Sequence, residues 1–157
     1  LGLKVNVTKS SETLKALNPD ITIWAVEPEN AAILAGGTVG THIQMGIGDG
    51  VVPKVLNQHI YEDIAIISDE EALRTSRDLA RLEGLMCGIS SGTNVAAAIK
   101  MAKKLGKGKT VVTILPDTAE RYFSTPLFES NLHASMPAWL VARGNKRAKL
   151  SFILFSS

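Results

Sequence analysis

The chain of 157 residues has little net charge, a single cysteine and no long hydrophobic run. Its 17 basic and 15 acidic residues leave a formal charge of +2, too small for the electrostatic surface of a nucleic-acid-binding protein. Cys87 cannot form an internal disulfide framework and has apolar neighbours, so we expect a reduced, cytoplasmic compartment. No apolar run approaches the roughly 18 to 20 residues that span a bilayer, and the N-terminus is no signal peptide. We therefore expect a soluble protein without a membrane partner.

Short β-branched runs alternate with helical patterns along the chain, which is typical of an α/β fold. The patterns predict helices near 69–83 and 92–105, and strands near 21–26, 64–67, 85–89 and 111–115. Ser68 and Glu71 form the capping box expected at the start of the first predicted helix. This alternation implies right-handed crossovers and a mostly parallel sheet with helices on its faces.

The stretch from residue 36 to 53 is rich in glycine and has little periodicity, so we expect a long loop with unusual backbone dihedrals or a close approach to another group. It lacks the Lys-Ser/Thr of a P-loop, and no Gly-x-Gly-x-x-Gly follows the first predicted strand, so neither nucleotide motif is present. The three histidines are far apart and have no cysteine or carboxylate cluster beside them, so we expect no metal site; they are His42, His59 and His133.

Polar residues follow two of the predicted strands. Ser90 and Ser91 come after the run 85–89 at the start of a helix, and Asp117 and Thr118 come after 111–115. Ligands of an open parallel sheet bind beyond the carboxyl ends of its strands, and a helix N-terminus attracts polar acceptors. An ordinary N-cap serine and an ordinary turn explain the same residues, so on this pattern both explanations remain open. Glu27 follows the first strand and is a third candidate.

Four motifs taken in order and spacing are similar to the C-terminal half of the cysteine synthase family, the O-acetylserine sulfhydrylases, which are pyridoxal-phosphate (PLP) enzymes of fold type II. The motifs are 46–53, 68–71, 88–92 and 115–128. The resemblance covers about residues 11 to 129, and we expect residues 1–129 to be the C-terminal part of a cysteine synthase-like domain. Residues 130–157 do not match the family. They contain an apolar run at 150–155 that is an aggregation hazard if exposed.

The resemblance implies a β-replacement in which sulfide displaces the acetate of O-acetylserine to give cysteine, with PLP carrying the chemistry. By resemblance Ser90, rather than Ser91, occupies the position of the serine that faces the pyridine nitrogen. Gly46 matches a glycine that lines the substrate side of the cleft, where a Cβ would intrude, and Asp117 and Thr118 are further candidates on the cofactor side. For a whole protein, the resemblance implies a homodimer and a complex with serine acetyltransferase.

Two residues depart from the commonest form of the motifs: Met45 precedes Gly46, and Ala119 replaces a frequent glycine. The family's Schiff-base lysine, its asparagine loop and its phosphate loop lie N-terminal to the matched region, and the chain contains none of these motifs. We therefore expect this chain alone to be catalytically incomplete, to supply no catalytic residue and to hold PLP poorly. The alternative is a non-catalytic remnant or interaction module that pairs through an exposed sheet edge.

Overall fold

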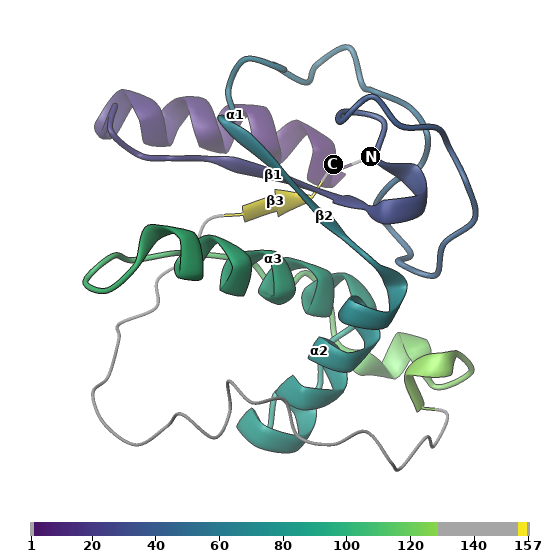
Figure 1. Cartoon of the computed structure of the whole chain (residues 1–157). Helices are drawn as coiled ribbons and strands as arrows, with labels where there is room; N and C mark the ends of the chain where they lie inside the picture. Colours follow the sequence, from purple (N-terminus) through teal and green to yellow (C-terminus); the bar gives the residue numbers. More distant parts are fainter. Residues whose placement is uncertain (1, 129–153, 157) are drawn as a thin grey trace.

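A computed structural model describes residues 2–128 and 154–156, and places three parallel strands beside three α-helices (Figure 1). In chain order the elements are α1 (Gly2–Leu17), β1 (Trp24–Pro28), β2 (Asp63–Ile67), α2 (Asp69–Glu83), α3 (Ile89–Leu105) and β3 (Leu154–Ser156). Short 3-10 helices cover Glu29–Ala31, Ala119–Tyr122 and Pro126–Phe128.

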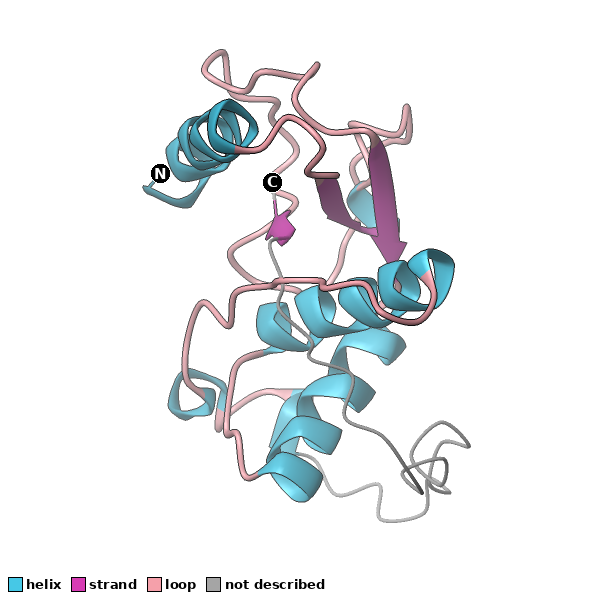
Figure 2. Cartoon of the chain, turned by 90° about the vertical axis from the view of Figure 1, so that its left-hand side faces the viewer, coloured by secondary structure: helices cyan, strands magenta, loops and turns pink. Residues whose placement is uncertain are grey.

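The sheet has the strand order β2-β1-β3, and both pairings are parallel. Every residue of β1 is buried, as expected for a central strand of a parallel sheet. In Figure 2, α2 and α3 lie together on one side of the strands, and α1 lies apart from them. The core forms between the sheet and α3, where Val26, Ile67 and Ile89 are fully buried. The predicted α/β fold with a parallel sheet is confirmed.

Helix α2 has the bounds that the sequence predicts, because its signals are local. The Ser68 hydroxyl accepts a hydrogen bond from the Glu71 backbone N–H, and the Glu71 carboxylate accepts one from the Ser68 backbone N–H. Gly84 ends the helix in the left-handed conformation with φ +70°. Helix α3 packs closely on α2 at Gly92, where a Cβ would lie 2.1 Å from the backbone oxygen of Ala72.

Two predicted strands are wrong. Residues 85–89 form only a single antiparallel bridge, between Cys87 and Thr118, and α3 begins earlier than predicted, at Ile89. Residues 111–115 form no ladder with any other described residue. A strand requires a ladder partner, and neither run forms a ladder with a described strand.

The N-terminal and C-terminal ends also differ from the sequence expectation. No element was expected before residue 21, yet α1 begins at Gly2; Val5, Val7 and Thr8 are β-branched and only weakly favour helix. The first strand lies at 24–28 instead of 21–26. Part of the apolar run at 150–155 pairs with β1, because Leu154–Ser156 form β3 opposite Trp24–Val26. Residues 129–153 and 157 lie outside the described part, so the expected division at residue 130 stays a prediction.

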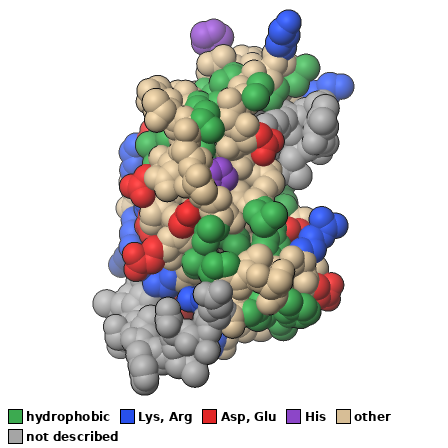
Figure 3. All heavy atoms as spheres, turned by 90° about the vertical axis from the view of Figure 1, so that its right-hand side faces the viewer, with side chains coloured by type: hydrophobic (Ala, Val, Ile, Leu, Met, Phe, Trp, Pro, Cys, Tyr) green, Lys and Arg blue, Asp and Glu red, His purple; other side chains and the backbone are tan. Residues whose placement is uncertain are grey.

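Within residues 2–128 and 154–156, no helix combines the length and the apolar character needed to cross a membrane. On the face drawn in Figure 3, hydrophobic side chains are interspersed with acidic and basic ones, without a broad surface of one charge. That distribution agrees with the small net charge of the sequence.

Candidate functional site

The first turn of α3 and the segment that follows residues 111–115 are held together by backbone hydrogen bonds. The N–H of Gly88, the N-cap residue, donates to the carbonyl of Asp117 at 3.1 Å. The N–H of Ala119 donates to the carbonyl of Met86 at 3.2 Å. These bonds bring Asp117 beside Ser90, although the two residues belong to separate motifs of the sequence.

A chain of side-chain hydrogen bonds joins Ser90, Tyr122 and Asp117. The Tyr122 hydroxyl donates to Oδ2 of Asp117 at 2.6 Å, and the phenol oxygen also hydrogen-bonds with the Ser90 side chain. Burial raises the pKa of Tyr122 to about 12, with help from Asp117 and against the opposing effects of Ser90 and Arg121. The phenol therefore stays protonated near neutral pH and links the serine to the carboxylate.

The two adjacent serines face different surroundings. Both serines are buried, with 4% of Ser90 and none of Ser91 exposed. The Ser91 hydroxyl lies against the thiol of Cys87, whose pKa is raised by burial and lowered in part by Ser91 and Ser76. Neither serine is the N-cap of α3; that residue is Gly88, without a side-chain cap. The ordinary N-cap explanation is therefore wrong for both serines.

Asp117 and Thr118 differ in how they lie at this turn. Oδ1 of Asp117 is buried and has no hydrogen-bond partner among the described residues. A Cβ on Gly88 would lie 2.2 Å from that oxygen, so only glycine fits there. Thr118 is exposed, and its hydroxyl points to Glu120 at 3.4 Å. The structure thus brings Asp117, but not Thr118, into the cluster of Ser90 and Tyr122.

The glycine-rich loop is closed on itself by a histidine. The backbone N–H of Gln44 donates to Nδ1 of His42 at 3.2 Å, and Nε2 of His42 lies 3.2 Å from the carbonyl of Gly48. Because Nδ1 accepts, the proton of a neutral ring sits on Nε2, which can donate to Gly48. At Gly46 φ is +89° and no described atom lies within 4 Å of an ideal Cβ. Glycine is needed there for its dihedral, and the space beside it is open.

Gln44 connects this loop to three other elements, a role that the sequence analysis missed. Its side chain is fully buried, and Nε2 donates to the carbonyl of Ile67 at 3.0 Å and to Oδ1 of Asp69 at 2.8 Å. Its Oε1 accepts from the Thr93 hydroxyl at 2.8 Å. A lone glutamine in a glycine-rich loop gives no signal in the sequence, because its partners are far away along the chain.

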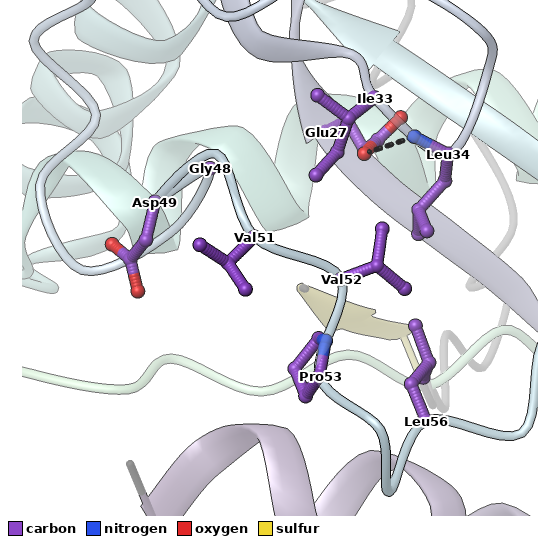
Figure 4. Close-up of a pocket in the computed structure, with 9 residues that line it drawn as sticks. All are labelled: Glu27, Ile33, Leu34, Gly48, Asp49, Val51, Val52, Pro53 and Leu56. Atoms are coloured by element: carbon purple, nitrogen blue, oxygen red, sulfur yellow. Dashed lines mark hydrogen bonds between the residues drawn. The ribbon is translucent and has the colours of Figure 1, made fainter.

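Glu27 lies at a small hollow beside the glycine-rich loop (Figure 4). The hollow is lined by Glu27, Ile33, Leu34, Gly48, Asp49, Val51, Val52, Pro53 and Leu56. The Glu27 carboxylate accepts hydrogen bonds from the backbone N–H groups of Leu34 at 2.8 Å and Ala35 at 3.1 Å. Burial raises its pKa and these N–H groups oppose the rise. Glu27 thus anchors the loop, and its carboxylate is engaged.

Two lysines of α3 form ion pairs. Lys100 pairs with Glu71 at 3.0 Å, and Lys104 pairs with Asp63 at 2.7 Å, which lowers the pKa of Asp63. Among the described residues no three His, Cys, Asp or Glu side chains are arranged to hold a metal ion.

Comparison with known proteins identifies the family to which the chain belongs. A family model described as "Pyridoxal-phosphate dependent enzyme" matches residues 8–117. A cysteine synthase from Staphylococcus aureus is 49% identical over 117 residues, which cover 74% of this chain and 38% of that protein. A probable cysteine synthase from Bacillus subtilis is 46% identical over 127 residues, which cover 81% of this chain and 41% of that protein. The chain thus spans about two-fifths of the length of these curated relatives.

Solved structures give the same fold. The crystal structure of an O-ureido-L-serine synthase matches with a TM-score of 0.76 and 38% identity, covering 87% of this chain and 43% of that chain. A cysteine synthase from Entamoeba histolytica matches with a TM-score of 0.76 and 37% identity, covering 80% of this chain and 37% of that chain.

Proposed function

Because the chain belongs to the pyridoxal-phosphate dependent enzyme family, we propose that it supplies the Ser90 and Gly46 side of a cysteine synthase site. The proposed reaction is the replacement of the acetate group of O-acetylserine by sulfide, which gives cysteine and acetate. The observation that carries this proposal is the 49% identity to the Staphylococcus aureus cysteine synthase over 117 residues. Since the chain covers 38% of that relative, the activity belongs to the whole protein.

PLP, when bound, supplies the electron sink that lets the bond at the substrate's β-carbon break. The residues at the first turn of α3 fit its ring edge: Ser90 offers a hydroxyl, and Oδ1 of Asp117 is a buried acceptor without a described partner. We propose that the Ser90 hydroxyl hydrogen-bonds with the ring nitrogen and that Asp117 supports Ser90 through Tyr122. Thr118 stays a candidate at the rim, because its side chain is exposed.

In this proposal the side chains bind and orient, and none of the described residues breaks a bond. Ser90 is a neutral group, so it does not hold a proton on a ring nitrogen as a carboxylate would. The Asp117 carboxylate is directed to the Tyr122 hydroxyl at 2.6 Å, and Tyr122 in turn holds Ser90. Gly46 leaves room beside the loop for a small amino-acid substrate. When PLP is bound, Ser90 would present its hydroxyl to the ring nitrogen.

The assembly and compartment are part of the same proposal. We propose a homodimer, with serine acetyltransferase as a further partner, on the basis of the family resemblance. We place the protein in the cytoplasm because its single cysteine is a free, buried thiol.

The proposal is tested by measuring PLP binding and turnover. The sample is the natural gene product, which is the protein as its own gene encodes it. We expect one bound PLP per chain, detected by its visible absorbance, and release of cysteine and acetate in equal amounts from O-acetylserine and sulfide. Omission of sulfide is the control and should abolish cysteine release. A natural gene product that binds no PLP would contradict the proposal and favour the alternative, an interaction module pairing through β2, whose Ile66 is 41% exposed.

A further inference from the structure

We infer that Gln44 is a positioning residue that fixes the Gly46 loop against the N-terminal part of α3. The separation between a substrate beside Gly46 and a group beside Ser90 is then set by the side chain of Gln44. The identity of these two ligands rests on the proposed function, whereas the fixing of the loop rests on hydrogen bonds and burial alone.

Both the nitrogen and the oxygen of the Gln44 side-chain amide form hydrogen bonds. Nε2 has two N–H groups, and these donate to the carbonyl of Ile67 and to Oδ1 of Asp69. Oε1 accepts from the Thr93 hydroxyl. A flipped amide would place Oε1 against two acceptors, so the partners themselves settle its orientation. Because Gln44 is fully buried, loss of any one of these bonds leaves a polar group unpaired away from water.

Asp69 attaches two successive loop residues to the first turn of α2. Its Oδ1 accepts from the Gln44 side chain at 2.8 Å, and its Oδ2 accepts from the backbone N–H of Ile43 at 3.1 Å. A carboxylate is also favoured at this position by the dipole of α2, which begins at Asp69. Residues 43 and 44 of the loop are therefore fixed to the junction of β2 and α2.

Thr93 attaches the same glutamine to the helix that carries Ser90. Ser90 and Thr93 are three positions apart on α3, so they lie on neighbouring turns of one helix face. The Thr93 hydroxyl also lies 3.1 Å from the carbonyl of Ile89, which holds its rotamer. The bond between Thr93 and Gln44 thus relates the loop to the Ser90 side of α3.

His42 makes the rest of the loop move together with Gln44. Its ring joins the backbone N–H of Gln44 to the carbonyl of Gly48, so residues 44 to 48 form a closed unit around Gly46. A Cβ on Gly48 would lie 2.9 Å from Nε2 of His42, which shows how closely the ring packs on the loop. A displacement of Gln44 therefore displaces Gly46.

Three variants of the natural gene product separate this role from a general loss of stability. Thr93→Val removes the hydroxyl that contacts Oε1 of Gln44 and the carbonyl of Ile89. Gln44→Leu removes all three bonds of the glutamine side chain at similar volume, and Thr93→Ser keeps the hydroxyl as the matched control. The first readout is amide hydrogen exchange at residues 45–49, which needs no substrate. We expect exchange there to quicken by about tenfold in Thr93→Val, more in Gln44→Leu, and to stay within about twofold in Thr93→Ser.

The second readout is the KM for O-acetylserine at unchanged PLP content. We expect it to rise by about tenfold in Thr93→Val, because a displaced loop misplaces the substrate, and to stay near that of the unsubstituted protein in Thr93→Ser. Unchanged exchange at 45–49 in Thr93→Val, or quickened exchange with an unchanged KM, would overturn the inference. If the unsubstituted protein makes no cysteine, the proposed function fails, and the exchange data still decide whether Gln44 fixes the loop.

Discussion

The first turns of α3 and the loop around Gly46 both depend on glycine, but for different physical reasons. At Gly92 the helix approaches α2 so closely that a Cβ would lie 2.1 Å from the carbonyl oxygen of Ala72. At Gly46 the surroundings are open and φ is +89°, a conformation that other residues rarely adopt. The helix needs the absence of a side chain for packing, whereas the loop needs it for its backbone. Substitutions at the two positions should therefore differ in cost.

The largest expected effect is that of Gly92→Ala. The new methyl group would meet backbone atoms of Ala72 and Ser76, which cannot move unless α2 and α3 separate. We expect the free energy of unfolding to fall by about 3 kcal/mol or more. Urea denaturation followed by circular dichroism measures this loss.

Gly46→Ala is the matched control for that measurement. Its methyl group enters open space, so only the backbone strain at positive φ remains, and we expect a loss of about 1 kcal/mol. Equal losses in the two variants would remove the distinction between the helix turn and the loop.

The next effect concerns the hydrogen bonds among Asp117, Tyr122 and Ser90 at the first turn of α3. The pKa of Tyr122 is raised from 10.0 to about 12, so between these values the folded state holds a proton that the unfolded state has lost. Stability from this source is complete below pH 10 and is lost as the pH rises to about 12. Asp117→Asn removes the carboxylate that contributes to the rise, so we expect the Tyr122 midpoint to move downward.

Phenolate absorbance after a rapid pH jump measures that midpoint. The chain has two tyrosines, so the titration is done in a Tyr61→Phe background. Thr118→Ala is the control, because Thr118 hydrogen-bonds with Glu120 outside the cluster, and it should leave the midpoint in place. A Tyr122 midpoint that rises or stays fixed in Asp117→Asn contradicts the described chain of bonds.

The sequence predicts elements well where their signals are local and poorly where they depend on a partner. The capping box and Gly84 define α2 within its own residues, and its bounds are confirmed. The runs 85–89 and 111–115 have the composition of strands, but pairing decides whether a strand forms, and the described residues give them none beyond one bridge. Composition cannot reveal that β1 is paired on both edges.

The same rule holds for the candidate site. Ser90 and Gly46 are found from their motifs, and their roles toward a ligand stay predictions. Gln44 is missed because its bond to Thr93 joins residues 49 positions apart. Tyr122 lies within the motif 115–128, but the sequence assigns it no role, since only the bridge between Cys87 and Thr118 brings its segment to the α3 turn. Long-range contacts of this kind require the folded structure.

The central claim is that Ser90, and not its neighbour Ser91, faces the cofactor. The most direct measurement compares Ser90→Ala with Ser91→Ala in the natural gene product, by the visible absorption band and the affinity of bound PLP. Loss of the Ser90 hydroxyl should shift the band and weaken PLP binding by about tenfold, because a hydrogen bond to the ring is removed. Ser91→Ala should leave the band in place, since that side chain faces Cys87. A shifted band in Ser91→Ala with an unchanged band in Ser90→Ala would contradict the account.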